Sequence, residues 1–296
     1  MNLYMARKWL VAGMVVAIAI PLAACSGGHT PASPGGGGGQ QPSAPSTPTA
    51  DGGLSSAAGA PVTATATASP STTAPASANA TAAASPAPPQ TVYAITFTGN
   101  SALYSLSPRS DSETLKGYTG VELTDITAAG KILYAISFTD LYRLDAATGA
   151  SHDIGSLGFS TANALVTQPN TGTLYGADES GDFFTINQDT GHATLVGTFG
   201  GGLGSAGDLA FYNGLLYAAV SEGGSAESYL ATVDVRTGAA TIVGNTGYAN
   251  VWGVVAGSGA LYGATDGGLF LAISPTTGRA KALWQEGLAV GGMAVP

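Results

Sequence analysis

Residues 164–197 read ALVTQPNTGTLYGADESGDFFTINQDTGHATLVG. This stretch holds four short apolar runs: Ala164–Gln168, Leu174–Ala177, Phe183–Asn187 and Ala193–Gly197. Turn residues rich in Gly, Asn, Asp and Pro divide the runs, as they do between the strands of an antiparallel meander. The stretch therefore predicts four short strands that follow one another in a single sheet.

The same pattern occurs five times within residues 91–296. Each copy centres on a tyrosine, and neighbouring tyrosines are 41, 41, 42 and 45 residues apart: Tyr93, Tyr134, Tyr175, Tyr217 and Tyr262. A repeat of about 40 to 50 residues built from four short strands is typical of a propeller blade. We therefore expect an all-β fold, a five-bladed β-propeller of four-stranded blades.

The two ends of the repeat region indicate how the ring closes. The first copy begins directly at Thr91 and lacks the apolar run that precedes the tyrosine elsewhere, whereas Ala289–Val295 is left over at the C-terminus. We expect this C-terminal strand to pair with the first blade, which leaves no gap in the ring. The expected blades are 91–118 with 288–296, then about 121–159, 162–200, 206–247 and 250–284.

A Thr-Gly pair recurs in four copies, at Thr148-Gly149, Thr190-Gly191, Thr237-Gly238 and Thr277-Gly278. A turn whose second residue takes a positive φ explains the glycine, because only glycine enters that region without a steric cost. Glycine loops also cradle phosphate at helix starts, but no helix start follows these pairs. We interpret them as turns between strands.

The N-terminus has the features of an export signal. Arg7 and Lys8 precede the apolar stretch Trp9–Ile20, which is short for a transmembrane helix, and Leu22–Cys25 reads LAAC. This tetrad resembles the lipobox of bacterial lipoproteins. The resemblance implies that residues 1–24 are a signal peptide removed by signal peptidase II, and that Cys25 carries a diacylglyceryl group and an amino-terminal acyl chain such as palmitate.

Two or more acyl chains give durable anchoring. We therefore expect the protein in the cell envelope, attached by Cys25 to a membrane on its extracytoplasmic side, periplasmic or at the cell surface. Cys25 is the only cysteine, so one chain forms no disulfide. Residues 26–90 are mostly Ala, Pro, Ser, Thr and Gly with one charge, Asp51, a composition that cannot bury a core. We expect 25–90 to be the lipidated residue and a disordered tether, and 91–296 to be the propeller.

The net charge of -9 argues against a nucleic-acid partner. Acidic residues gather in the turns and links expected on one face of the ring, the top face: Asp140, Asp178, Glu179, Asp182, Glu222, Glu227, Asp266 and Glu286. Lys131, Arg236 and Arg279 fall in turns of the opposite face. Either these carboxylates are solvated turn residues, or the top face attracts cations or binds a protein or a neutral glycan. Phe159, Tyr248 and Trp252 are then either core plugs or sugar platforms.

Asp125 and Asp208 are the candidate residues of the central channel. Each lies nine residues before the tyrosine of its copy, on the expected inner strand, and the matching positions in the other copies are Ala164, Gly253 and Gly292. The two carboxylates either bind a divalent cation or cap neighbouring backbone amides. Two carboxylates supply few of the six to eight ligands that calcium takes. No other cofactor is expected.

Motifs of catalysis are scarce. GxSxG and HExxH are absent, and the three histidines, His29, His152 and His192, lie apart from the channel aspartates. The repeats over 91–296 resemble those of secreted bacterial propellers of the YVTN and NHL type. Asp145–Gly149 (DAATG) is also similar to quinoprotein repeats, although the tryptophan that those repeats use for docking is missing from every copy.

These resemblances imply a propeller rather than an activity. We therefore expect a lipid-anchored extracytoplasmic propeller that acts as a binding or scaffolding module and not as an enzyme. The alternative is a hydrolase or lyase that acts on a sugar or lactone in the mouth of the channel. Five-bladed glycosidases use three carboxylates that converge on the channel, and this sequence offers two.

Overall fold

The computed structural model describes residues 89, 91–110, 112–285 and 287–296. The predictions made for the signal peptide, for Cys25 and for nearly all of the tether lie outside these residues. Within the part of the chain that is described, no helix is long and apolar enough to cross a membrane.

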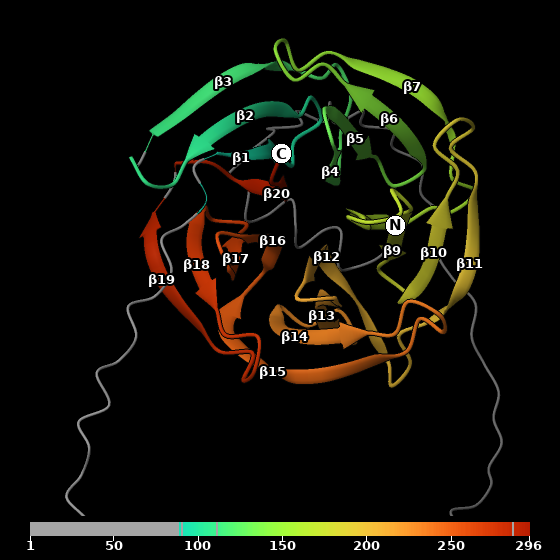
Figure 1. The fold of residues 1–296 in the computed structure, drawn as a ribbon, viewed down its shortest axis with the longest axis vertical. Helices are drawn as coiled ribbons and strands as arrows, with labels where there is room; N and C mark the ends of the chain where they lie inside the picture. The colour runs from blue at the N-terminus through green and yellow to red at the C-terminus, as the bar shows by residue number, and fades with distance from the viewer. Residues whose placement is uncertain (1–88, 90, 111, 286) are drawn as a thin grey trace, which may run out of the picture. The chain divides into compact units, whose positions relative to one another are not determined.

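The described residues form an all-β ring of five blades, each a four-stranded antiparallel sheet (Figure 1). From the centre outward, blade 1 holds β20 (Val290–Ala294), β1 (Val92–Thr96), β2 (Ala102–Ser107) and β3 (Ser112–Tyr118). Blade 2 holds β4 (Asp125–Ala129), β5 (Ile132–Ile136), β6 (Asp140–Leu144) and β7 (Ser151–Ser156). The five-bladed propeller predicted from the repeat is confirmed.

The other three blades continue in chain order. Blade 3 holds β8 (Ala162–Thr167), β9 (Leu174–Asp178), β10 (Asp182–Ile186) and β11 (Ala193–Thr198). Blade 4 holds β12 (Leu203–Tyr212), β13 (Leu215–Glu222), β14 (Glu227–Val233) and β15 (Ala240–Ala249). Blade 5 holds β16 (Val251–Gly257), β17 (Ala260–Thr265), β18 (Leu269–Ile273) and β19 (Ala280–Gln285).

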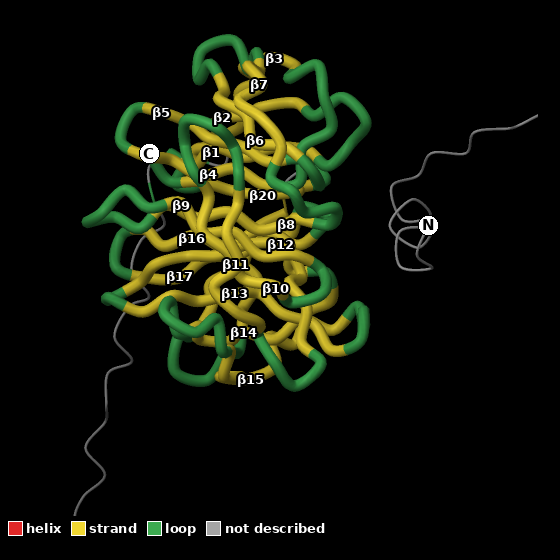
Figure 2. Tube along the Cα trace, turned by 90° about the vertical axis from the view of Figure 1, so that its right-hand side faces the viewer, coloured by secondary structure: helices red, strands yellow, loops and turns green. Residues whose placement is uncertain are grey.

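The C-terminal strand closes the ring, as predicted. β20 pairs antiparallel with β1, with Tyr93 opposite Ala294 and Ile95 opposite Gly292. Blade 1 therefore takes its inner strand from one end of the propeller sequence and its other three strands from the opposite end. Figure 2 shows the blades from the side, with their strands running between two layers of turns.

The apolar core lies between the blades rather than inside any one of them. Five clusters of buried side chains each combine residues of two neighbouring blades. The cluster between blades 3 and 4, for example, holds Tyr175 and Phe183, whose rings stack with centroids 5.2 Å apart, together with Leu216 of β13. Because the cluster between blades 5 and 1 is of the same kind, the ring is sealed by packing as well as by strand pairing.

The Thr-Gly turns have a second role at the joints between blades. Their glycines take positive φ values between 72° and 77°, as predicted: Gly149, Gly191, Gly238 and Gly278. Each also abuts a glycine on the outer strand of the preceding blade; a Cβ on Gly149 would lie 2.8 Å from the carbonyl carbon of Gly117. The blades approach one another closely here, which the sequence pattern alone did not indicate.

Candidate functional site

The two channel aspartates occupy equivalent places on the inner strands of blades 2 and 4. Asp125 pairs with Ile136, the second residue after the tyrosine of its blade. In the other blades the same register pairs Ala164 with Ala177, Gly253 with Ala264 and Gly292 with Ile95. Asp208 lies beside the Leu209–Ala218 pair, at the end of a bulge in β12. The alignment of these five positions from the sequence is therefore confirmed.

The two carboxylates bind one backbone N–H from each of the five inner strands. Asp125 accepts hydrogen bonds from the N–H of Ile126 at 2.7 Å and of Leu165 at 2.6 Å. Asp208 accepts the other three, from Leu209 at 2.6 Å, Val254 at 2.8 Å and Met293 at 3.3 Å. Inner strands of neighbouring blades do not pair with one another, so these amides need other acceptors. Of the two roles considered for the aspartates, this geometry is that of a backbone cap.

Glycine at the matching positions leaves room for neighbouring side chains in the channel, the Asp125 carboxylate among them. A Cβ on Gly292 would overlap the Asp125 side chain, and one on Gly253 would lie 2.8 Å from the Met293 side chain. Both aspartates have no exposed surface. The cross-section of the channel at this level is therefore filled.

Burial raises the pKa of both carboxyls well above the usual range. For Asp125 the negative charge of Asp208 raises the pKa further, while the N–H groups of Leu165 and Ile126 partly oppose the rise. For Asp208 the N–H groups of Val254 and Leu209 oppose the effect of burial, and a hydrogen bond with Asp125 lowers the pKa as well. The pair therefore holds a proton at pH values where an exposed aspartate has lost its own.

Aromatic side chains close the channel at the end where the inner strands begin. Phe97 meets Phe138 edge-on at 6.0 Å and Trp252 edge-on at 5.8 Å between ring centroids. The cavity beside these rings has a volume of about 10 Å³, roughly what a single water molecule needs. Trp252 is thus a core plug rather than a sugar platform, and we call this side of the ring the closed end.

The other two aromatic residues considered as platforms also pack against the protein. Phe159 stacks on Phe184 with the centroids 4.3 Å apart. The hydroxyl of Tyr248 accepts a hydrogen bond from the N–H of Ala282 at 3.2 Å. Both side chains are half-buried. They serve the blade joints, which favours the core interpretation.

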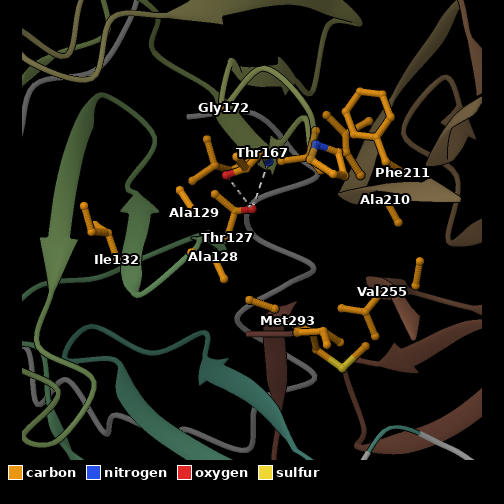
Figure 3. Close-up of a pocket in the computed structure, with 18 of the residues that line it drawn as sticks. Thr127, Ala128, Ala129, Ile132, Thr167, Gly172, Ala210, Phe211, Val255 and Met293 are labelled. Carbon is orange, nitrogen blue, oxygen red and sulfur yellow. Dashed lines mark hydrogen bonds between the residues drawn. The ribbon is translucent and has the colours of Figure 1, made fainter. Parts of the chain in front are cut away.

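The opposite side of the ring, the open end, holds a cavity of about 600 Å³ (Figure 3). Its floor includes Leu165, Leu209 and Met293, whose N–H groups donate to the buried carboxylates beneath it. Thr127 and Thr167 form a polar side of the cavity: the Thr127 hydroxyl donates to Thr167 Oγ1 at 3.2 Å and accepts from the Thr167 N–H at 2.9 Å. No charged side chain is among the described residues that line it.

The sequence pattern did not indicate this cavity. It forms where the inner strands end and turn into the second strands, at the level of Gly130 and Gly172. The small residues of the inner strands, such as Ala128, Ala210 and Ala256, were the available signal. These small residues enclose a cavity only where five inner strands meet around one axis, and a single repeat does not show that arrangement.

The acidic residues lie around the closed end, in the turns between second and third strands, as predicted; Glu286 is outside the described residues. Several of these carboxylates bind polar groups of their own turn or of a neighbouring link. Asp178 accepts hydrogen bonds from the N–H of Ser180 and Asp182, both at 2.9 Å, and burial raises its pKa. Asp266 accepts from the Asn250 side-chain amide at 3.0 Å. This pattern favours their interpretation as turn residues.

The described residues contain no group of three or more His, Cys, Asp or Glu side chains arranged to hold a metal ion. His152 is exposed on the outer strand β7, and His192 is exposed in the turn before β11. Neither histidine comes near the buried carboxyl pair in the arrangement of the blades.

Comparison with known proteins adds the fold and no more. No family model matches the sequence, and no curated protein matches it. Among solved structures, the chain is similar to one in the crystal structure of the nidogen/laminin complex, with a TM-score of 0.50 and 13% identity over 69% of this chain and 80% of that chain. At this identity the likeness supports the class that the blades define, a β-propeller.

Proposed function

We propose that this chain is a lipid-anchored propeller of the extracytoplasmic cell envelope that acts as a binding or scaffolding module. The observation that carries the proposal is the use of the channel carboxylates: each is buried, and each binds backbone amides of neighbouring blades. Carboxylates that bind the backbone amides of several blades stabilise the ring. They are not oriented toward a substrate.

The alternative, a hydrolase or lyase in the channel mouth, needs carboxylates that a sugar or lactone can reach. At the closed end, Asp125 has no exposed surface, and Phe97 packs edge-on against Trp252 beside a cavity of only about 10 Å³. At the open end, the backbone of Leu165 and Met293 forms the floor of the cavity above the carboxyl pair. Binding is therefore favoured over catalysis. The solved structure to which the fold is similar is a complex of two proteins by its title, which is consistent with a protein partner.

The anchoring part of the proposal is carried by the LAAC tetrad and the single cysteine. In a bacterial host fed labelled palmitate, the wild-type chain should incorporate label and be found in the membrane fraction. The Cys25→Ala variant should incorporate none and accumulate as precursor. Equal labelling of the two forms would contradict lipidation at Cys25.

The binding part is tested separately, with the chain that begins at Ser26. We expect it to bind a protein or peptide and to show no turnover of a panel of glycosides and lactones. Turnover that is lost in the Asp125→Asn variant, with the fold intact by circular dichroism, would support the enzyme instead.

A further inference from the structure

The inner strands present free edges to the cavity at the open end. Within a strand, residues two apart direct their N–H and C=O groups to the same side. The N–H groups of Ile126, Leu209 and Val254 point into the channel, since the buried aspartates accept them. Two residues further along the same strands, the backbone groups of Ala128, Phe211 and Ala256 therefore point into the channel as well.

Those three residues line the cavity of about 600 Å³. The equivalent N–H in blade 3, that of Thr167, is accepted by the Thr127 hydroxyl at 2.9 Å. For Ala128, Phe211 and Ala256, no described side chain accepts the N–H. The chain thus provides acceptors for one ring of channel amides and leaves most of the next ring open to whatever enters the cavity.

Donors and acceptors occur together along these edges. In an antiparallel ladder a residue turns both its N–H and its C=O to one side, so each free position offers one donor and one acceptor. An unpaired strand edge of this kind is a template for another extended chain. Small side chains at Ala128, Ala210 and Ala256 leave the backbone within reach.

The lining also restricts the charge of an occupant. No charged side chain is among the described residues that line the cavity, and the whole chain carries a net charge of -9. An ionised group placed here would lose water without gaining a partner. The volume falls within the range of roughly 300 to 1,000 Å³ that is usual for ligand sites.

We propose that the cavity at the open end binds an extended, uncharged peptide segment whose main chain pairs with the free edges of the inner strands. Strand addition of this kind takes its affinity from main-chain hydrogen bonds and its specificity from contacts to alternate side chains. Phe211 and Met293 lie in the cavity wall to make such contacts, across from Thr127 and Thr167 (Figure 3). This inference rests on the proposed function as a binding module and places its partner at the open end, opposite the acidic turns of the closed end.

The test uses the chain that begins at Ser26 and a library of end-capped hexapeptides made of Gly, Ala, Ser, Thr and Val. We expect members that bind with about millimolar or tighter dissociation constants, and for these the amide signals of Ala128, Phe211 and Ala256 in ¹⁵N spectra should shift. Methylation of alternate peptide nitrogens should weaken binding about tenfold, because it removes donors while it leaves the side chains unchanged.

Two variants probe the protein side. Ala256→Pro removes a donor that the strand ladder does not use, so the fold should persist and binding should weaken about tenfold. Ala128→Tyr fills the cavity and provides the same test if the proline variant is unstable. The matched control, Glu227→Gln with Asp266→Asn, removes charge at the closed end and should leave binding unchanged.

Three results would overturn the inference. One is the absence of binding by any library member at several millimolar. Another is binding that neither methylation nor the Ala256→Pro and Ala128→Tyr substitutions weaken. The third is a neutral oligosaccharide that binds in the cavity while the peptides do not. A partner that binds at the closed end instead would support the proposed binding function and contradict only its assignment to this cavity.

Discussion

The buried carboxyl pair predicts that the propeller is more stable at pH 5 than at pH 7, the reverse of ordinary acid destabilisation. Burial raises the pKa values of Asp125 and Asp208 in the folded state, whereas an unfolded aspartate titrates near 3.9. The folded protein therefore binds more protons than the unfolded chain. Stability from this source is fully present below the unfolded pKa and is lost as the pH rises through the folded values.

The expected size follows from the number of protons. If the pair keeps one proton across the interval from pH 5 to pH 7, the free energy of unfolding falls by about 1.4 kcal/mol per pH unit, or about 2.7 kcal/mol in all. For a domain of this length, that corresponds to a shift in Tm of roughly 5 to 10 °C. Asp178 adds an effect of the same sign, because burial raises its pKa too.

Other carboxyls act in a different interval. Backbone hydrogen bonds lower the pKa values of the exposed Asp145 and Asp234, so the stability that they contribute is lost only below their unfolded pKa near 3.9. Measurements between pH 5 and pH 7 therefore isolate the buried groups. Constant ionic strength removes differences in the screening of the net charge.

The assay is urea unfolding of the chain from Ser26, followed by tryptophan fluorescence at pH 5, 6 and 7. Asp125→Asn should flatten the pH profile, because the amide cannot exchange a proton. At pH 5 it should also cost about 1 to 3 kcal/mol, since one N–H loses its acceptor, and this difference should shrink toward pH 7 as the wild type loses stability; the slope is therefore the readout. Asp153→Asn, at an exposed position on β7, is the matched control. A wild-type profile that is flat or falls toward pH 5, or an unchanged slope in Asp125→Asn, would refute the reasoning.

The remaining predictions concern closure, the blade joints and the cation hypothesis. Deletion of Leu288–Pro296 removes β20, so the variant should aggregate or melt far below the full chain in calorimetry; an unchanged Tm would mean that the ring closes in another way. Gly191→Ala should lower the free energy of unfolding by more than the roughly 1 kcal/mol of positive-φ strain, because its Cβ would overlap the backbone of the preceding blade. Gly214→Ala is the control: its φ is similar and the space around it is open, so urea unfolding should show the strain alone. Millimolar calcium should leave the Tm unchanged; a rise that Asp125→Asn with Asp208→Asn abolishes would instead support a cation between the carboxylates.

The fold could be predicted from the sequence because its signals are local. The spacing of the tyrosines and the turn residues between apolar runs define each blade without reference to the others. Closure could also be predicted, since Ala289–Val295 has no partner in its own copy and Thr91 begins a copy that lacks one. The observed β20 (Val290–Ala294) lies within the predicted strand, and it pairs with β1.

The site could be predicted only in part. The register placed Asp125 and Asp208 in the channel, but the choice between a cation site and a backbone cap depended on the amides of Val254 and Met293, which come from other blades. Phe97 belongs to the connection between β1 and β2, and its place over the channel mouth follows from the ring rather than from the repeat. The free strand edges of the cavity could not be predicted from the sequence, because they consist of backbone N–H and C=O groups, which nearly every residue type carries.

The number of carboxylates explains why three blades lack one. Five inner strands present five N–H groups at this level, and the four oxygens of Asp125 and Asp208 accept all five, since one oxygen of Asp208 takes two. A third aspartate, at the position of Gly253 for example, would find no unbound amide there and would add a charge to a site that already holds a proton to reduce repulsion. Glycine and alanine are therefore what the remaining blades require. The buried carboxylates thus stabilise the ring. The free strand edges at the open end remain as the part of the channel that can bind a partner.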